Sequence, residues 1–172
     1  MFYLVRHGEP DYSEINTKIY RDFGTHLCPL TSRGCEQIKN TAKDSRLKNA
    51  ELIITSPYVR ALQTAAILSK ELGIEIVVET DLHEWLANKY YIFENEEVAK
   101  ENIAEFDAHN GNYPVGLEKN WETFEMMRTR ALKVLEKYKD YNHVIVTCHG
   151  RLMQAITGCH HPEHGEAFEF KL

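Results

Sequence analysis

Short apolar runs alternate with segments of helical periodicity along this chain, and the alternation limits the folds that it can adopt. Apolar runs of four or five residues bounded by turn signals are typical of buried strands. We expect such strands at residues 2–5, 52–55, 74–78, 143–147 and 167–170. Strands that alternate with helices form mostly parallel sheets covered on both faces. The sequence therefore predicts an α/β fold of three layers, α/β/α, around a mostly parallel central sheet.

The segments between these runs carry helix signals. Thr31 can cap the first helix, and Ser56 followed by Pro57 can cap the second, which Gly73 ends. Residues 94–107 hold six acids and one base, which predicts a solvated, partly helical excursion. The first two helices are expected to cover residues 31–46 and 57–72. Two more are expected at residues 121–138 and after Gly150.

Length and composition bound the class of protein. A chain of 172 residues fits one domain, here residues 1–172, and is long enough to bury a core. A net charge of −6 without a basic stripe argues against a nucleic-acid partner, and the lack of a long apolar stretch or secretory signal argues against a membrane partner. Four scattered cysteines without a CxxC pair favour free thiols over disulfides. We therefore expect a cytoplasmic protein.

Two of the expected strands lead into a His-Gly pair. Residues 2–5 run into Arg6-His7-Gly8, and the fourth strand runs into His149-Gly150. Ligands of open α/β sheets bind at the carboxyl ends of strands. Taken alone, the first motif is as compatible with a structural histidine beside an exposed arginine as with a phosphate-handling site. The second pair favours a phosphate-handling active site.

The residue types at this edge suit phosphoryl transfer. A neutral imidazole such as His7 can attack phosphorus, and the guanidinium of Arg6 can hold a phosphoryl group through paired hydrogen bonds. Arg60 lies near a helix N-terminus, which itself favours anions. His149, with Gly150 beside it, can bind a phosphoryl oxygen and stabilise developing charge. Such a set supplies positioning and charge neutralisation without a metal or cofactor.

A leaving alkoxide also needs a proton donor. Glu84 follows the third expected strand and stands beside Trp85. Burial there, or a bound phosphate dianion, would favour its protonated form. Nothing else in the residues selects Glu84 from the other acids of the chain, which are expected to be solvated.

Four blocks of residues lie in order along the chain at 4–9, 29–34, 56–65 and 146–150. In this order they resemble the histidine phosphatase superfamily, the phosphoglycerate mutase-like group. They span nearly the whole chain. Two further segments look like the family's acid motif and the start of its penultimate helix. These two segments are residues 82–84 and Glu122-Thr123 with Arg130.

The resemblance implies a phosphatase whose His7 becomes transiently phosphorylated. Arg6, Arg60 and His149 would bind the phosphoryl group and Glu84 would donate the proton. The implied fold is a mixed α/β sandwich around a chiefly parallel sheet. The chain departs from the family pattern after the first motif, where residues 10–13 lack a common Asn. It departs again after Glu84, where a Gly-rich continuation is absent.

The function predicted is metal-independent hydrolysis of the phosphomonoester of a small metabolite. One alternative is a phosphoglycerate mutase, which returns the phosphoryl group to a second hydroxyl. A non-catalytic phosphate-binding module and a zinc-binding structural protein are the others. The spacing of the cluster Cys159, His160, His161 and His164 matches no standard zinc site, so we expect an exposed loop there.

Substrate selectivity is expected to lie in residues 11–27 and in a variable segment around 81–120 that roofs the site. The acidic run within the second segment would repel polyanionic substrates if it faced the pocket. Sugar phosphates, small phosphorylated cofactor precursors and phosphohistidine proteins all remain open, and the sequence predicts no oligomeric state. The candidate wall residues are Tyr12, Tyr20, Arg21, Trp85, Tyr90 and Tyr91.

Overall fold

The computed structural model describes residues 1–15, 17 and 22–172 of the chain. Its described part contains a five-stranded sheet in the order β3-β2-β4-β1-β5. Neighbouring strands are parallel except for β5, which runs antiparallel to β1. The predicted mostly parallel sheet is confirmed. The strands are β1 (Phe2–Arg6), β2 (Leu52–Thr55), β3 (Ile76–Val78), β4 (Val144–Cys148) and β5 (Ala167–Phe170).

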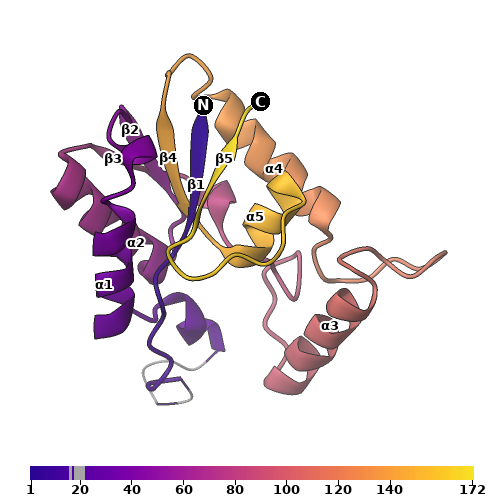
Figure 1. Cartoon of the computed structure of the whole chain (residues 1–172). Coiled ribbons are helices and arrows are strands. Elements are labelled where there is room, and N and C mark those ends of the chain that lie inside the picture. The colour runs from indigo at the N-terminus through magenta and orange to yellow at the C-terminus, as the bar shows by residue number, and fades with distance from the viewer. Residues whose placement is uncertain (16, 18–21) are drawn as a thin grey trace.

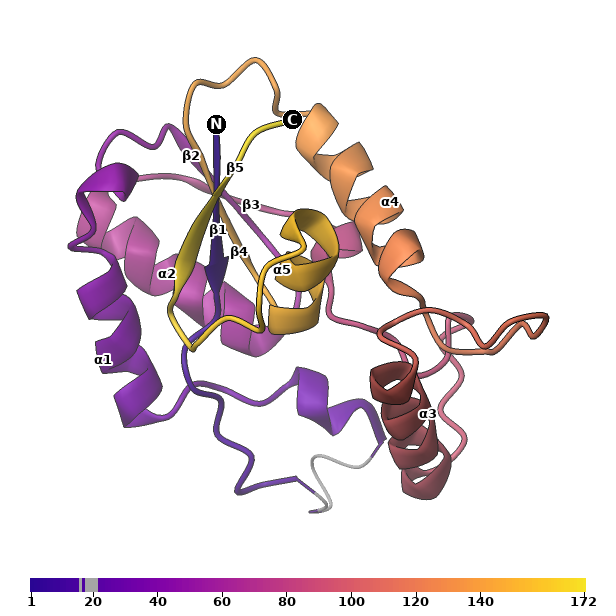
Figure 2. The same ribbon diagram turned by 45° about the vertical axis from the view of Figure 1, so that its right-hand side comes forward.

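Helices α1 and α2 cover one face of the sheet and α4 and α5 cover the other, which gives the predicted three layers (Figure 1). Helix α3 lies beside the start of α4, on the side where the parallel strands end (Figure 2). Within the described part of the chain, every helix is too short or too polar to cross a bilayer. The helices are α1 (Ser32–Thr41), α2 (Val59–Leu72), α3 (Glu96–Ala108), α4 (Phe124–Glu136) and α5 (Gly150–Thr157).

Alternation along β1 divides the core into two clusters. Leu4 points toward α4 and α5, where it joins a cluster with Met127, whereas Val5 packs with Ile38 and Leu68 under α1 and α2. Successive side chains of a strand point to opposite faces, so a strand buried on both sides must be apolar throughout. This explains why the first apolar run is continuous.

Several helix bounds differ from the expectation, and α4 is shorter at both ends than the predicted 121–138. Thr31 caps α1 as predicted, by accepting a hydrogen bond from the Gly34 amide at 2.9 Å, but α1 ends at Thr41 rather than at residue 46. Ser56 is not the N-cap of α2. That position belongs to Tyr58, and Ser56 Oγ accepts a bond from the Tyr58 amide at 3.3 Å. The chain turns once more before α2 begins, so Arg60 is the second residue of the helix.

The turn after β1 is locked onto the start of α1. A Cβ atom added to Gly8 would lie 2.5 Å from the Gly34 carbonyl oxygen, and one added to Gly34 would lie 2.3 Å from the Glu9 carbonyl oxygen. The Thr31 amide also donates to the Glu9 carbonyl at 2.9 Å. Only glycines permit this approach of two backbones, so the conformation that carries His7 depends on both of them.

We expect Gly34→Ala to destabilise the protein, because its Cβ would meet backbone atoms that cannot move independently. Overpacking of this kind costs about 1–3 kcal/mol. The measurement is the free energy of unfolding from urea denaturation. Ser32→Ala, an exposed change in the same turn of α1, is the control. Equal stability of the two variants would contradict the locked turn.

Candidate active site

The parallel pairing of β1 with β4 brings the two predicted histidines together. Arg6 is in register with Cys148, so His7 and His149, which directly follow, are neighbours at the carboxyl edge of the sheet. The ring centroids are 5.2 Å apart and the planes meet at 63°. Both side chains are buried. Residues that are 142 positions apart in sequence thus form one constellation.

Hydrogen bonds fix the protonation state of His7. Its Nδ1 lies 2.8 Å from the Gly8 carbonyl oxygen, which can only accept, so Nδ1 carries the proton. The Nε2 atom accepts a hydrogen bond from Arg60 Nε at 3.2 Å. Burial and the charge of Arg60 hold the pKa of His7 well below its ordinary value. The ring is therefore neutral, with its lone pair on Nε2.

Arg60 is positioned by groups that the sequence did not reveal. Its guanidinium donates to the Thr25 carbonyl at 2.9 Å and lies over the Tyr58 ring, 5.1 Å from the centroid. One turn along α2, Thr64 Oγ1 donates to the Arg60 carbonyl at 2.8 Å and accepts from the Gly8 amide at 3.2 Å. The Thr64 hydroxyl thus ties α2 to the turn that carries His7. A backbone carbonyl has no sequence signal, so the Thr25 contact could not have been predicted.

His149 keeps one ring nitrogen available. Its Nε2 forms a hydrogen bond with Ser56 Oγ at 2.7 Å, while Nδ1 is buried and has no partner among the described residues. Burial, followed by the charge of Arg60, lowers the pKa of His149 well below its ordinary value. When Ser56 donates to Nε2, Nδ1 carries the proton. An orphaned buried donor is uncommon and suits a group that binds a ligand oxygen.

Arg6 is the last residue of β1 and directly precedes His7. Its guanidinium donates to the Pro162 carbonyl, and its Nε atom is buried without a partner in the described part of the chain. Burial lowers the pKa of Arg6, and the charges of Glu84 and Glu163 oppose that effect. Glu84 is therefore within electrostatic reach of the arginine that follows β1.

The backbone of Glu84 is held firmly. Its carbonyl accepts bonds from His83 Nδ1 at 2.7 Å and from Arg130 at 3.4 Å, and its Oε1 accepts from the Trp85 amide at 2.9 Å. Arg130 is itself fixed by a buried ion pair with Glu122, with contacts of 2.6 and 3.0 Å. The Glu122 and Arg130 motif near the start of α4 thus positions the candidate acid through its main chain.

The expectation of an exposed loop around the second histidine cluster is wrong for His164. His160 is exposed and faces Glu166, and Cys159 is half-buried. His161 is exposed and packs on Gly150, where an added Cβ would lie 2.4 Å from its ring. The His164 ring is half-buried, 5.5 Å from that of His7. The described residues contain no group of three or more His, Cys, Asp or Glu arranged to hold a metal ion.

The expected wall residues divide into three groups. Trp85 is buried in the core and donates to the Glu122 carbonyl at 2.6 Å, so its assignment to the wall is wrong. Tyr12, Tyr90 and Tyr91 are exposed, and the hydroxyl of Tyr91 donates to the neutral ring of His83 at 2.7 Å. Tyr20 and Arg21 lie outside the described residues.

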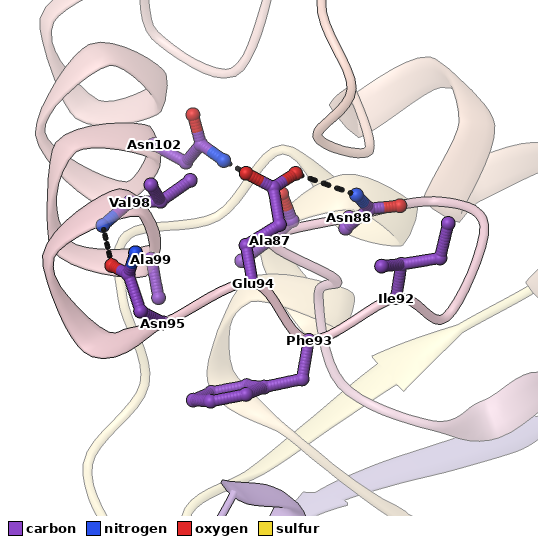
Figure 3. Close-up of a pocket in the computed structure, with 9 residues that line it drawn as sticks. All are labelled: Ala87, Asn88, Ile92, Phe93, Glu94, Asn95, Val98, Ala99 and Asn102. Carbon is purple, nitrogen blue, oxygen red and sulfur yellow. Dashed lines mark hydrogen bonds between the residues drawn. The ribbon is translucent and has the colours of Figure 1, made fainter.

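Two cavities border the segment around 81–120. The first measures about 30 Å³ and is lined by the residues between Ala87 and Asn102 that are drawn in Figure 3. This volume holds a water molecule or two but not a substrate. The second measures about 370 Å³ and is lined in part by Phe106, Arg151 and His161. Since His161 also packs on Gly150, this larger cavity lies beside the first residue of α5.

Comparison with known proteins points to one family. The sequence profile of the histidine phosphatase superfamily (branch 1) matches residues 2–170. A protein of Hydrogenobacter thermophilus, provisionally named phosphoserine phosphatase 2, is 28% identical over 157 residues, which are 90% of this chain and 75% of that protein. The adenosylcobalamin/alpha-ribazole phosphatase of Escherichia coli is 22% identical over 158 residues, with 90% and 75% covered.

The solved structures agree on the fold. A mycobacterial glucosyl-3-phosphoglycerate phosphatase superposes with a TM-score of 0.67 at 18% identity, covering 91% of this chain and 77% of that one. The YhfR protein of Bacillus stearothermophilus gives the same TM-score at 22% identity, with the same coverage. At these identities the likeness concerns the fold.

The buried imidazoles predict that stability falls on acidification. Histidines of the unfolded chain titrate near pH 6.5, whereas the pKa of His26 is about 4 and those of His7, His83 and His149 are also lowered. Below pH 6.5 the unfolded chain therefore binds more protons. We expect the free energy of unfolding to decrease from pH 7 to pH 5, by up to about 1.4 kcal/mol per pH unit for each such histidine.

Urea denaturation at several pH values measures this dependence. His149→Gln removes one contributing group and should flatten the slope, whereas His109→Gln, an exposed change, should leave it unaltered. A stability that is constant over this range would contradict neutral buried imidazoles.

Proposed function

The chain belongs to the histidine phosphatase superfamily, and we propose that it hydrolyses phosphomonoesters of small metabolites through a phosphohistidine at His7. The observation that carries the proposal is the neutral His7 ring, whose Nε2 lone pair lies beside Arg60 and within the same site as His149. A nucleophile held without a proton on its reactive atom needs no separate base.

The first step is attack of His7 Nε2 on phosphorus. A bond forms between Nε2 and phosphorus while the bond to the ester oxygen breaks. Arg60 transfers its hydrogen bond from Nε2 to a phosphoryl oxygen, and Arg6 and His149 donate to the other oxygens. Groups already in place when charge develops reorganise little, which is the main source of electrostatic catalysis.

Glu84 completes the proton balance. In its protonated form it gives the proton to the leaving alkoxide, and in its ionised form it removes a proton from the attacking water. The water oxygen bonds to phosphorus, the bond to Nε2 breaks, and inorganic phosphate leaves. His7 returns to its neutral tautomer. The cycle assigns no step to a metal or cofactor.

The surroundings of the site support a small substrate. We assign the leaving group to the cavity of about 370 Å³ beside α5, whose lining combines aromatic, amide and charged side chains. Residues 1–172 act as one domain in this proposal, and the segment around 81–120 roofs the site. The four cysteines are free, which fits a cytoplasmic enzyme.

We expect His7→Ala to lower hydrolysis of p-nitrophenyl phosphate by on the order of 10³-fold or more, because the nucleophile is lost. His109→Ala is the control. The wild-type protein is also quenched during turnover in acid or in base and analysed by mass spectrometry. We expect a phosphoryl adduct on His7 that survives the base quench. Full turnover by His7→Ala would contradict the mechanism.

Isomerisation of a phosphoglycerate without phosphate release would favour a mutase, and binding without turnover would favour a non-catalytic module.

Loss of the proton donor should depend on the leaving group. We expect Glu84→Gln to lower kcat for an alkyl phosphate such as glycerol phosphate by about 10²–10⁴-fold and to affect p-nitrophenyl phosphate far less, because nitrophenolate leaves without a proton. Glu163→Gln, which removes another charge near Arg6, is the matched control. Equal losses for both substrates would assign Glu84 to binding rather than proton transfer.

A further inference from the structure

A third imidazole lies at the proposed nucleophile. The ring centroid of His164 is 5.5 Å from that of His7, and the two planes meet at 42°. The His164 side chain is half-buried. His7 and His149 are fully buried in comparison.

The main chain around His164 is fixed to the end of β1. The Gly165 amide donates to the Arg6 carbonyl at 3.1 Å, and the Arg6 amide donates to the Glu166 carbonyl at 3.0 Å. Thr41 of α1 donates to the Gly165 carbonyl at 2.7 Å. Gly165 has a φ of +80°, which favours glycine at this turn. The Arg6 guanidinium also donates to the Pro162 carbonyl, so the loop is anchored before and after His164 in the chain.

The ring nitrogens of His164 form no hydrogen bond with the part of the chain that the structure describes. In contrast, His7 is bonded to Gly8, His149 to Ser56 and His83 to Tyr91. An anchored imidazole with two available nitrogens, next to the nucleophile and to Arg6, has the geometry of a ligand-binding group.

We propose that His164 is a further phosphoryl-binding residue, which donates a hydrogen bond to a phosphoryl oxygen and takes up a proton as the dianion binds. This inference rests on the proposed function, since it requires the phosphoryl group to occupy the site of His7. The protonated ring adds a cation to those of Arg6 and Arg60.

The charges around His164 permit this proton uptake. Arg6 and His161 face the ring together with His7, and Glu9 and Glu163 oppose their effect. Burial and Arg6 lower the pKa of His164, so the ring is neutral in the free enzyme at pH 7. A bound dianion reverses the local balance of charge and favours the imidazolium.

Sulfate is a suitable probe, because it is a tetrahedral dianion throughout the range from pH 6 to pH 8. We expect its Kd, measured by calorimetry, to decrease on acidification in the wild-type protein by up to about tenfold per pH unit. His164→Gln should bind more weakly at pH 6 and show a flatter dependence. His164→Lys, which is charged at every pH of the range, should restore tight binding without the pH dependence.

Two controls make the result specific. His160→Gln changes an exposed histidine of the same loop that pairs with Glu166, and it should behave like the wild type. Arg60→Gln should weaken sulfate binding at every pH, which places the anion at the phosphoryl site. Sulfate binding that is insensitive to Arg60→Gln, or a pH dependence that His164→Gln leaves unchanged, would overturn the proposal. Turnover through His7 in that case would leave the proposed function standing.

Discussion

The parallel pairing of β1 with β4 is the constraint on which the rest of the site depends. Both strands are buried on both faces, so a shift of one residue would exchange the two core clusters and is strongly disfavoured. The register therefore fixes where each strand ends. His7 and His149 meet because they are the first residues beyond those ends. The strand register alone places these two histidines next to each other, independently of any side-chain hydrogen bond.

Burial of so many basic groups has opposing consequences. Burial, followed by the charge of Arg60, keeps the pKa of His7 and of His149 low, so both rings are neutral. The same desolvation is unfavourable for Arg6, whose pKa it lowers. In the proposed function a phosphate dianion compensates these cations, so the free protein is arranged for its bound state. This arrangement explains why orphaned donors on Arg6 and His149 persist in the described structure.

The sequence was sufficient to predict those features that depend on the chemical type of a side chain. The apolar runs predicted the sheet, Thr31 and Gly73 marked helix ends, and the His-Gly pairs led to the two imidazoles. It was insufficient where backbone atoms or distant loops act. The carbonyls of Thr25 and Pro162 hold the two arginines, and the Pro162 contact joins residues 156 positions apart. His164 was missed for the same reason, because its loop is anchored by main-chain bonds to β1.

The protonation state of His7 is the central physical claim, and it is open to direct measurement. Long-range ¹H–¹⁵N correlation spectra of histidine-labelled protein, with the signals of His7 assigned through His7→Gln, distinguish the two neutral tautomers and the imidazolium. We predict a neutral ring that carries its proton on Nδ1 between pH 6 and pH 8. A proton on Nε2, or a charged ring in this range, would contradict the assignment of Nε2 as the nucleophilic atom.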